Sequence, residues 1–136
     1  MMRAGLVDIF RHEGAGYRAL VYHEGWRVAI LNDAGQFRRE NTTFLERHDR
    51  TDEAFILLEG ECALYIGEGG DGHPGAIRLL PMERGKIYNV KRGVWHNLAT
   101  VPGTAVLIVE NADTSPDNSP KMAVTPDMLP MWEFDG

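Results

Sequence analysis

The sequence predicts an all-β domain, and three observations lead to this prediction. Short runs rich in Val, Ile, Leu, Tyr and Trp recur from residue 18 to residue 110. Turn residues separate them at close to the interval of about 8–12 residues that is typical of sandwiches and barrels. No apolar pattern of helical period extends over three turns between these runs, which argues against a parallel α/β sheet.

The expected strands follow from these runs and from the turn residues between them. Gly25 and the segment 32–35, Asn-Asp-Ala-Gly, mark the first two turns. The segment 6–10, Leu-Val-Asp-Ile-Phe, fits either one helical turn or an edge strand. We expect strands at residues 18–22, 26–31, 44–48, 53–58, 61–66, 76–80, 87–90, 94–100 and 105–110.

A chain of 136 residues is expected to form one domain, here with three parts. These parts are an N-terminal arm at 1–17, a barrel at 18–110 and a Pro-rich tail at 111–136. The tail is rich in Pro, Ser, Thr and Asp, a composition that is extended or disordered by default. Its end nevertheless carries several large apolar residues, so we expect it to dock on its own barrel or on a neighbouring subunit. These residues are Met128, Leu129, Met131, Trp132 and Phe134.

Composition excludes several classes of partner. The chain has 14 basic and 20 acidic residues, a net charge of −6, so it lacks the positive surface that nucleic acid requires. No run approaches the roughly 18 apolar residues of a membrane span, and the first residues carry no apolar signal-peptide core. The only cysteine, Cys62, is expected to be a buried structural thiol, which fits a reducing, cytoplasmic compartment.

Spacing brings together candidate metal ligands. Glu46 and His48 alternate on an expected strand and so share a face. A polar loop at 49–52 would close a hairpin and set His48 opposite Glu53, with Cβ atoms roughly 5 Å apart. His96 would come from a distant strand. Two imidazoles and a carboxylate suit iron, manganese, nickel or zinc. The alternative from spacing alone is a set of surface His and Glu residues without a metal.

The strand at 53–58 is apolar on both faces. Phe55 and Leu57 follow Glu53 on one face and would form an apolar pocket floor. The opposite face presents Ala54, Ile56 and Leu58. A strand of this kind is covered on both sides, by a second sheet or by another subunit.

These residues resemble the two sequence motifs of the cupin superfamily. The first cupin motif reads His-x-His, three or four residues, Glu, six residues, Gly, and His48, Glu53 and Gly60 match its later positions. The second motif reads Gly-x5-Pro-x-Gly-x2-His-x3-Asn, and Gly85, Gly93 and His96 match it. The two motifs cover residues 46–100, and the expected strands extend the likeness to about 18–110.

The sequence departs from the cupin pattern at four positions. Glu46 occupies the place of the first metal histidine, Lys91 that of the proline, Thr100 that of the asparagine, and Glu40 that of an expected glycine. The change at Glu46 affects the coordination sphere itself. Glu46 is therefore a fourth ligand, a residue behind the ligands, or a general base beside a three-ligand metal.

The resemblance implies a cupin double-stranded β-helix, that is a jelly-roll barrel, and a homodimer. It implies a divalent metal ion (Fe, Mn, Ni or Zn) on His48, Glu53 and His96, and a small-molecule ligand. The expected function is a metal-dependent isomerase, epimerase, lyase or dioxygenase acting on a sugar or organic acid. The alternatives are a metal-bearing binding module without turnover and a structural barrel with hydrogen-bonded histidines. Arg50 or Arg47 would clamp an anionic group, and Tyr88 or Trp95 would shape the pocket.

Two further signals are interpreted conservatively. Residues 67–72 match Gly-x-Gly-x-x-Gly, but another strand follows where a dinucleotide site requires a helix, so we expect a hairpin loop. Glu110 ends the last strong strand and either reaches the pocket mouth or faces water.

Overall fold

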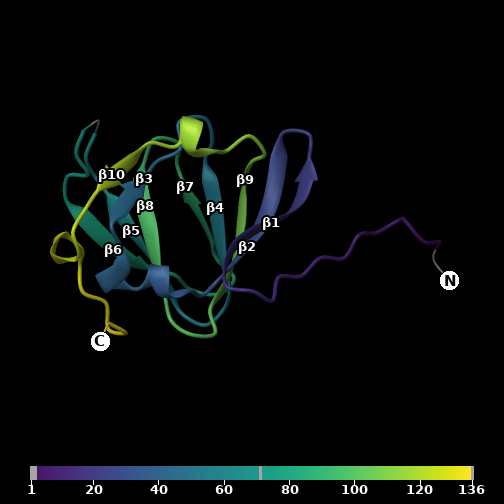
Figure 1. Cartoon of the computed structure of the whole chain (residues 1–136), viewed down its shortest axis with the longest axis horizontal. Coiled ribbons are helices and arrows are strands. Elements are labelled where there is room, and N and C mark those ends of the chain that lie inside the picture. The colour runs from purple at the N-terminus through teal and green to yellow at the C-terminus, as the bar shows by residue number, and fades with distance from the viewer. Residues whose placement is uncertain (1–2, 71, 136) are drawn as a thin grey trace.

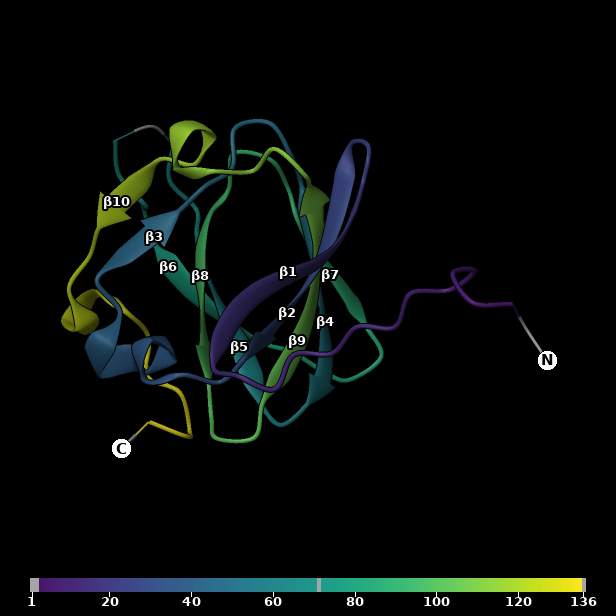
Figure 2. The same cartoon turned by 45° about the vertical axis from the view of Figure 1, so that its right-hand side comes forward.

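The chain folds into two five-stranded antiparallel sheets that face each other as the halves of a barrel (Figures 1 and 2). The structure is a computed structural model and describes residues 3–70 and 72–135. The first sheet contains, in spatial order, β1 (Gly16–His23), β2 (Trp26–Asn32), β9 (Ala105–Asn111), β4 (Glu53–Glu59) and β7 (Ile87–Val90). The second sheet contains β10 (Lys121–Ala123), β3 (Phe44–Glu46), β8 (Trp95–Thr100), β5 (Cys62–Gly67) and β6 (Ile77–Pro81).

The all-β prediction is confirmed for the described residues, which contain no α-helix. Within residues 3–70 and 72–135, helical geometry is limited to four short 3₁₀ turns, and every strand pair is antiparallel. These turns are η1 (Gly35–Phe37), η2 (Arg39–Asn41), η3 (Pro116–Asn118) and η4 (Pro126–Met128). None of the helical segments in the described ranges has the length and apolar character needed to span a bilayer.

The space between the sheets is filled in layers by the inward-facing residues of the strands. Strand register sets Ala29 of β2 and Phe55 of β4 opposite Ile108 of β9, and Leu98 of β8 opposite Leu64 of β5. Two residues further along the same strands a second apolar layer follows. All of these side chains are at most 5% exposed, so they form the continuous core that holds the two sheets together.

Gly60 has a steric role that explains its place in the motif. It lies in the turn between β4 and β5 with a φ of 76°, a conformation that residues with a Cβ rarely adopt. A Cβ at this position would also collide with the backbone and side chain of Thr104. The turns at Gly85 and Gly93 likewise have positive φ.

The prediction that a hairpin connects His48 and Glu53 is wrong. β3 ends at Glu46 and pairs with β8 and β10, whereas β4 pairs with β7 and β9 in the other sheet. The segment 47–52 therefore crosses from one sheet to the other. As a result, Glu46 of β3 and Glu53 of β4 reach the same cavity from opposite sheets.

The C-terminal tail packs against the outer face of the second sheet of its own chain. Val124, Leu129 and Trp132 are each no more than 6% exposed and pack with Tyr65 and Trp95 in a second apolar cluster. The tail also contributes the strand β10, which the sequence analysis missed because Lys-Met-Ala is too short to carry a strand pattern.

The N-terminal arm extends away from the barrel (Figures 1 and 2). Residues 6–10 form neither the helical turn nor the edge strand considered from the sequence. Asn32 Nδ2 donates hydrogen bonds to the carbonyl oxygens of His12 and Gly14, which fixes the end of the arm beside β2. β1 begins at Gly16, two residues before the expected start of the barrel.

Candidate metal centre

A cavity of about 310 Å³ lies between the two sheets at the end where β4 begins and β9 ends. Its floor is the apolar layer that contains Phe55, Leu98 and Ile108. Its walls carry the four predicted metal-site residues, together with residues from β1, β2, β9 and the tail. The polar residues that line it are Tyr17, Arg27, Gln36, Glu46, His48, Glu53, His96, Asn97, Glu110, Thr114, Ser115, Ser119 and Lys121.

Glu53 is the centre of this cluster. The Nε2 atoms of His48 and His96 lie 2.9 Å and 2.8 Å from Glu53 Oε1, within hydrogen-bond distance. All three side chains are buried, with relative exposures of 6%, 6% and 3% for His48, Glu53 and His96. Residues far apart in the sequence thus converge inside one barrel.

The outer nitrogen of each histidine ring is also held. His96 Nδ1 donates a hydrogen bond to the Val94 carbonyl at 2.9 Å, and His48 Nδ1 lies 2.7 Å from Ser119 Oγ. Because a carbonyl can only accept, the His96 proton is on Nδ1 and its Nε2 faces the cavity. This arrangement orients an imidazole as a metal ligand.

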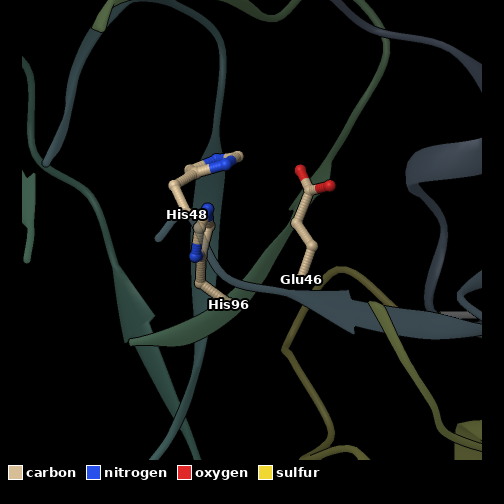
Figure 3. A group of neighbouring side chains, drawn as sticks. All are labelled: Glu46, His48 and His96. Atoms are coloured by element: carbon tan, nitrogen blue, oxygen red, sulfur yellow. The ribbon is translucent and has the colours of Figure 1, made fainter. Parts of the chain in front are cut away.

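Strand register places Glu46 beside the histidines. Glu46 is directly opposite His96 in the pairing of β3 with β8, and Figure 3 shows its carboxylate turned toward the same space as the rings of His48 and His96. Potential ligand atoms of these three residues lie within 4.8 Å of one another. A second such group consists of His48, Glu53 and Glu110, so His48 belongs to both.

Glu110 proves to be a cavity residue and is only 5% exposed. Its Oε1 accepts a hydrogen bond from Tyr17 at 2.7 Å and ion-paired bonds from Arg27 Nε and Nη2 at 3.2 Å and 2.9 Å. The sequence analysis missed Tyr17 and Arg27. The available signal was the alternation in β2 and β9, which places both Arg27 and Glu110 on the apolar, inward face of their strands.

The charged groups in the cavity shift one another's pKa. Burial raises the pKa of Glu53, but the hydrogen bonds and charges of His48 and His96 outweigh burial and lower it strongly. Burial lowers the pKa of His48, and the Glu53 carboxylate reverses this and raises it. Burial and the nearby Glu53 charge raise the pKa of Glu110. Carboxylates this close in a buried site favour a bound cation or a shared proton.

The four residues expected to bind or shape the substrate lie outside the lining of this cavity. Arg50 is exposed and 3.7 Å from Asp113, and the Arg47 guanidinium is 4.9 Å from the centre of the Trp95 ring. Trp95 is buried in the outer apolar cluster, since its side chain points away from the barrel interior. Tyr88 packs beside the core, and its hydroxyl accepts a hydrogen bond from the Glu83 backbone.

The fold of this chain is similar to that of solved structures. The sequence matches no known family model and no curated protein. A cupin-2 domain protein from Shewanella frigidimarina is 18% identical, with a TM-score of 0.51 over 74% of this chain and 84% of that chain. This chain has the cupin fold.

Two enzymes share this cupin fold. The nucleoside dehydratase Pac13 superposes with a TM-score of 0.58 and 9% identity, over 85% of this chain and 86% of that one. An oxalate decarboxylase from Bacillus subtilis superposes with a TM-score of 0.56 and 15% identity, over 82% of this chain and 29% of that one. At these identities the likeness concerns the fold, and the cavity residues must be interpreted from their own chemistry.

Proposed function

We propose that this chain is a metal-dependent cupin enzyme that acts on a small polar or anionic metabolite such as a sugar or an organic acid. The observation that supports the proposal is the buried convergence of His48, Glu53 and His96 in a cavity that holds two further carboxylates, Glu46 and Glu110. Three ligands would leave coordination positions open, and the additional carboxylates provide groups for proton transfer.

The donor set fits a divalent ion. Two ligands in neighbouring positions around one ion, each about 2.1 Å from it, are roughly 3 Å apart. The distances from Glu53 Oε1 to the Nε2 atoms of His48 and His96, 2.9 Å and 2.8 Å, are close to this separation. Mixed imidazole and carboxylate ligands suit iron, manganese, nickel and zinc, so any of these is compatible with the site.

The charge of the cavity supports a polar or anionic ligand. Glu46, Glu53 and Glu110 oppose Arg27 and Lys121, which leaves one excess negative charge when both histidines are neutral. A divalent ion would change this to one excess positive charge. The volume of about 310 Å³ is at the small end of ligand sites and fits a compact metabolite.

The cavity residues would divide the chemistry between them. His48, Glu53 and His96 would hold the ion, which when bound supplies Lewis-acid polarisation of a ligand oxygen. Glu46 is the candidate base because it faces the histidines from the second sheet, while Glu110 is held by Tyr17 and Arg27 on the opposite wall. This pair of carboxylates supports isomerase, epimerase or lyase chemistry. The dehydratase and the decarboxylase that share the fold are compatible with this proposal.

Metal analysis of freshly purified protein tests the metal site. The native protein should retain one divalent ion, and His48→Ala and His96→Ala should lose it. His73→Ala, which changes an exposed histidine in the 67–75 loop, is the matched control and should keep the metal. Equal metal content in all four proteins would eliminate the site and leave hydrogen-bonded histidines in a structural barrel.

Glu46→Gln separates an enzyme from a binding module. If Glu46 is a base, this variant should keep the metal and bind small acids or sugars, but lose turnover of any substrate found by screening. Loss of the metal would make Glu46 a ligand. Unchanged turnover would exclude it from both roles, and binding without turnover in the native protein would favour the module.

We further propose a cytoplasmic homodimer. The outer face of the first sheet is apolar across four strands, where Ile30, Leu107, Ile56 and Ile87 lie opposite one another in register. Ile87 is 71% exposed, and Ile9 in the extended arm is 91% exposed. A second copy would cover both surfaces. The location is supported by the single, buried thiol of Cys62.

The oligomeric state can be measured by sedimentation. Ile87→Lys should convert a dimer to a monomer, whereas Met131→Lys, a change of similar exposure in the tail, should not. A native protein that sediments as a monomer at all concentrations would refute the dimer. Cell fractionation tests the location.

A further inference from the structure

Backbone pairing between the C-terminal tail and the segment after β3 extends past the N-terminal end of β10 and reaches His48. β10 pairs with β3 in a register that sets Lys121 opposite Glu46. The same register persists past the end of β3, because the Arg47 amide donates to the Pro120 carbonyl at 3.1 Å and the Asp49 amide donates to the Asn118 carbonyl at 2.9 Å. This pairing sets Ser119 opposite His48.

The two backbone hydrogen bonds flank the pair formed by His48 and Ser119. In an antiparallel ladder, a pair between two hydrogen-bonded pairs has the shortest distance between strands and the closest side chains. Ser119 is 6% exposed, and its Oγ lies 2.7 Å from His48 Nδ1. A slip of one residue would place Asn118 or Pro120 there instead, so the register determines that a hydroxyl meets the ring.

The neighbouring contacts determine the direction of this hydrogen bond. Ser119 Oγ also donates to Asn118 Oδ1 at 3.3 Å, and Asn118 Oδ1 accepts from the Ser115 amide at 3.0 Å. With its proton used in this way, Ser119 accepts the Nδ1 proton of His48. The Nε2 atom of His48 is then directed at Glu53 inside the cavity.

We propose that Ser119 is a positioning residue for His48, and that the C-terminal tail is therefore part of the metal site. This inference rests on the metal site of the proposed function. The tail is anchored away from the cavity by Val124, Leu129 and Trp132 in the outer apolar cluster, which fixes the strand register and with it the orientation of His48. Outer partners of ligating histidines typically contribute 10–100-fold to metal affinity.

Isothermal titration calorimetry, in which Zn²⁺ is added to the metal-free, full-length protein, tests the inference. Ser119→Ala should weaken zinc binding by roughly 10–100-fold, and Ser119→Thr, which retains the hydroxyl, should restore most of it. Thr125→Val is the matched control, because it removes an exposed hydroxyl of the same tail that lies outside the lining of the cavity. This control should bind zinc like the native protein.

Nitrogen-15 NMR of the zinc-loaded native protein gives a second readout that requires no variant. His48 should carry its proton on Nδ1 and bind the metal through Nε2. Ligation through Nδ1, or native zinc affinity in Ser119→Ala, would overturn the inference while leaving the metal site intact. Absence of zinc binding by the native protein would instead refute both the inference and the proposed function.

Discussion

The two ends of the barrel interior are built on the same strands but have opposite chemistry. At one end β2, β4, β8 and β9 present Arg27, Glu53, His96 and Glu110 to the interior. Toward the other end of the barrel, two and four positions away on the same strands, the inner faces are apolar. They carry Ala29, Leu31, Phe55, Leu57, Leu98, Val106 and Ile108. The apolar burial inside the barrel is concentrated at this second end, which leaves the first end free to hold buried charges.

The largest expected effect is at the apolar end. Leu64→Ala removes a side chain that is 1% exposed and packs opposite Leu98. It should lower the free energy of unfolding by about 2–5 kcal/mol, because the close-packed core cannot fill the cavity. Urea denaturation in the presence of a chelator measures this. Zinc affinity of the folded variant should stay native, and a large loss of affinity would mean that the two ends are not separable.

The second prediction concerns the polar end and its response to pH. The lowered pKa of Glu53 contributes stability above its ordinary value of 4.5, which is lost as pH falls through the lowered pKa. The raised pKa of His48 contributes stability below its ordinary value of 6.5, which is lost as pH rises through the raised pKa. The metal-free protein should therefore be most stable between these two ordinary values.

The metal should reverse this trend, because zinc requires deprotonated imidazoles. Thermal unfolding from about pH 5 to about pH 8, with chelator and with zinc, compares the two states. Stabilisation by zinc should increase with pH. Parallel curves in the two series would show that the histidines do not bind the ion.

A smaller effect is expected at Glu110. Burial and the Glu53 charge raise its pKa, so its ionised form costs stability as pH rises above 4.5. Glu110→Gln removes this charge while its amide oxygen can still accept from Tyr17 and Arg27. The metal-free variant should lose less stability between about pH 5 and about pH 8 than the native protein. Glu59→Gln, on the exposed end of β4, is the control and should follow the native curve.

The smallest expected signal connects the two ends. Burial raises the pKa of the Cys62 thiol to about 12, and its side chain is 1% exposed, so thiol reagents should react only when the barrel opens. If the domain unfolds as one unit, zinc bound at the polar end should slow labelling of Cys62 at the apolar end. Labelling that is independent of zinc would show that the ends open separately.

The sequence by itself determined the strands β1 to β9, the all-β class and three of the converging side chains. The position of these strands requires little more than local physics, because each strand must direct an apolar face to the core. Gly60, Gly85 and Gly93 were found from the motif spacing, and all three have the positive φ that glycine adopts most readily.

The tertiary structure alone decided how these side chains meet. Local spacing suggested that His48 and Glu53 face each other across a hairpin, whereas they meet because the chain crosses from one sheet to the other. Glu110, Arg27 and Ser119 reach the site through pairings between strands that are distant in the sequence. Such pairings depend on how two sheets share one core, a condition that no single segment of the chain contains.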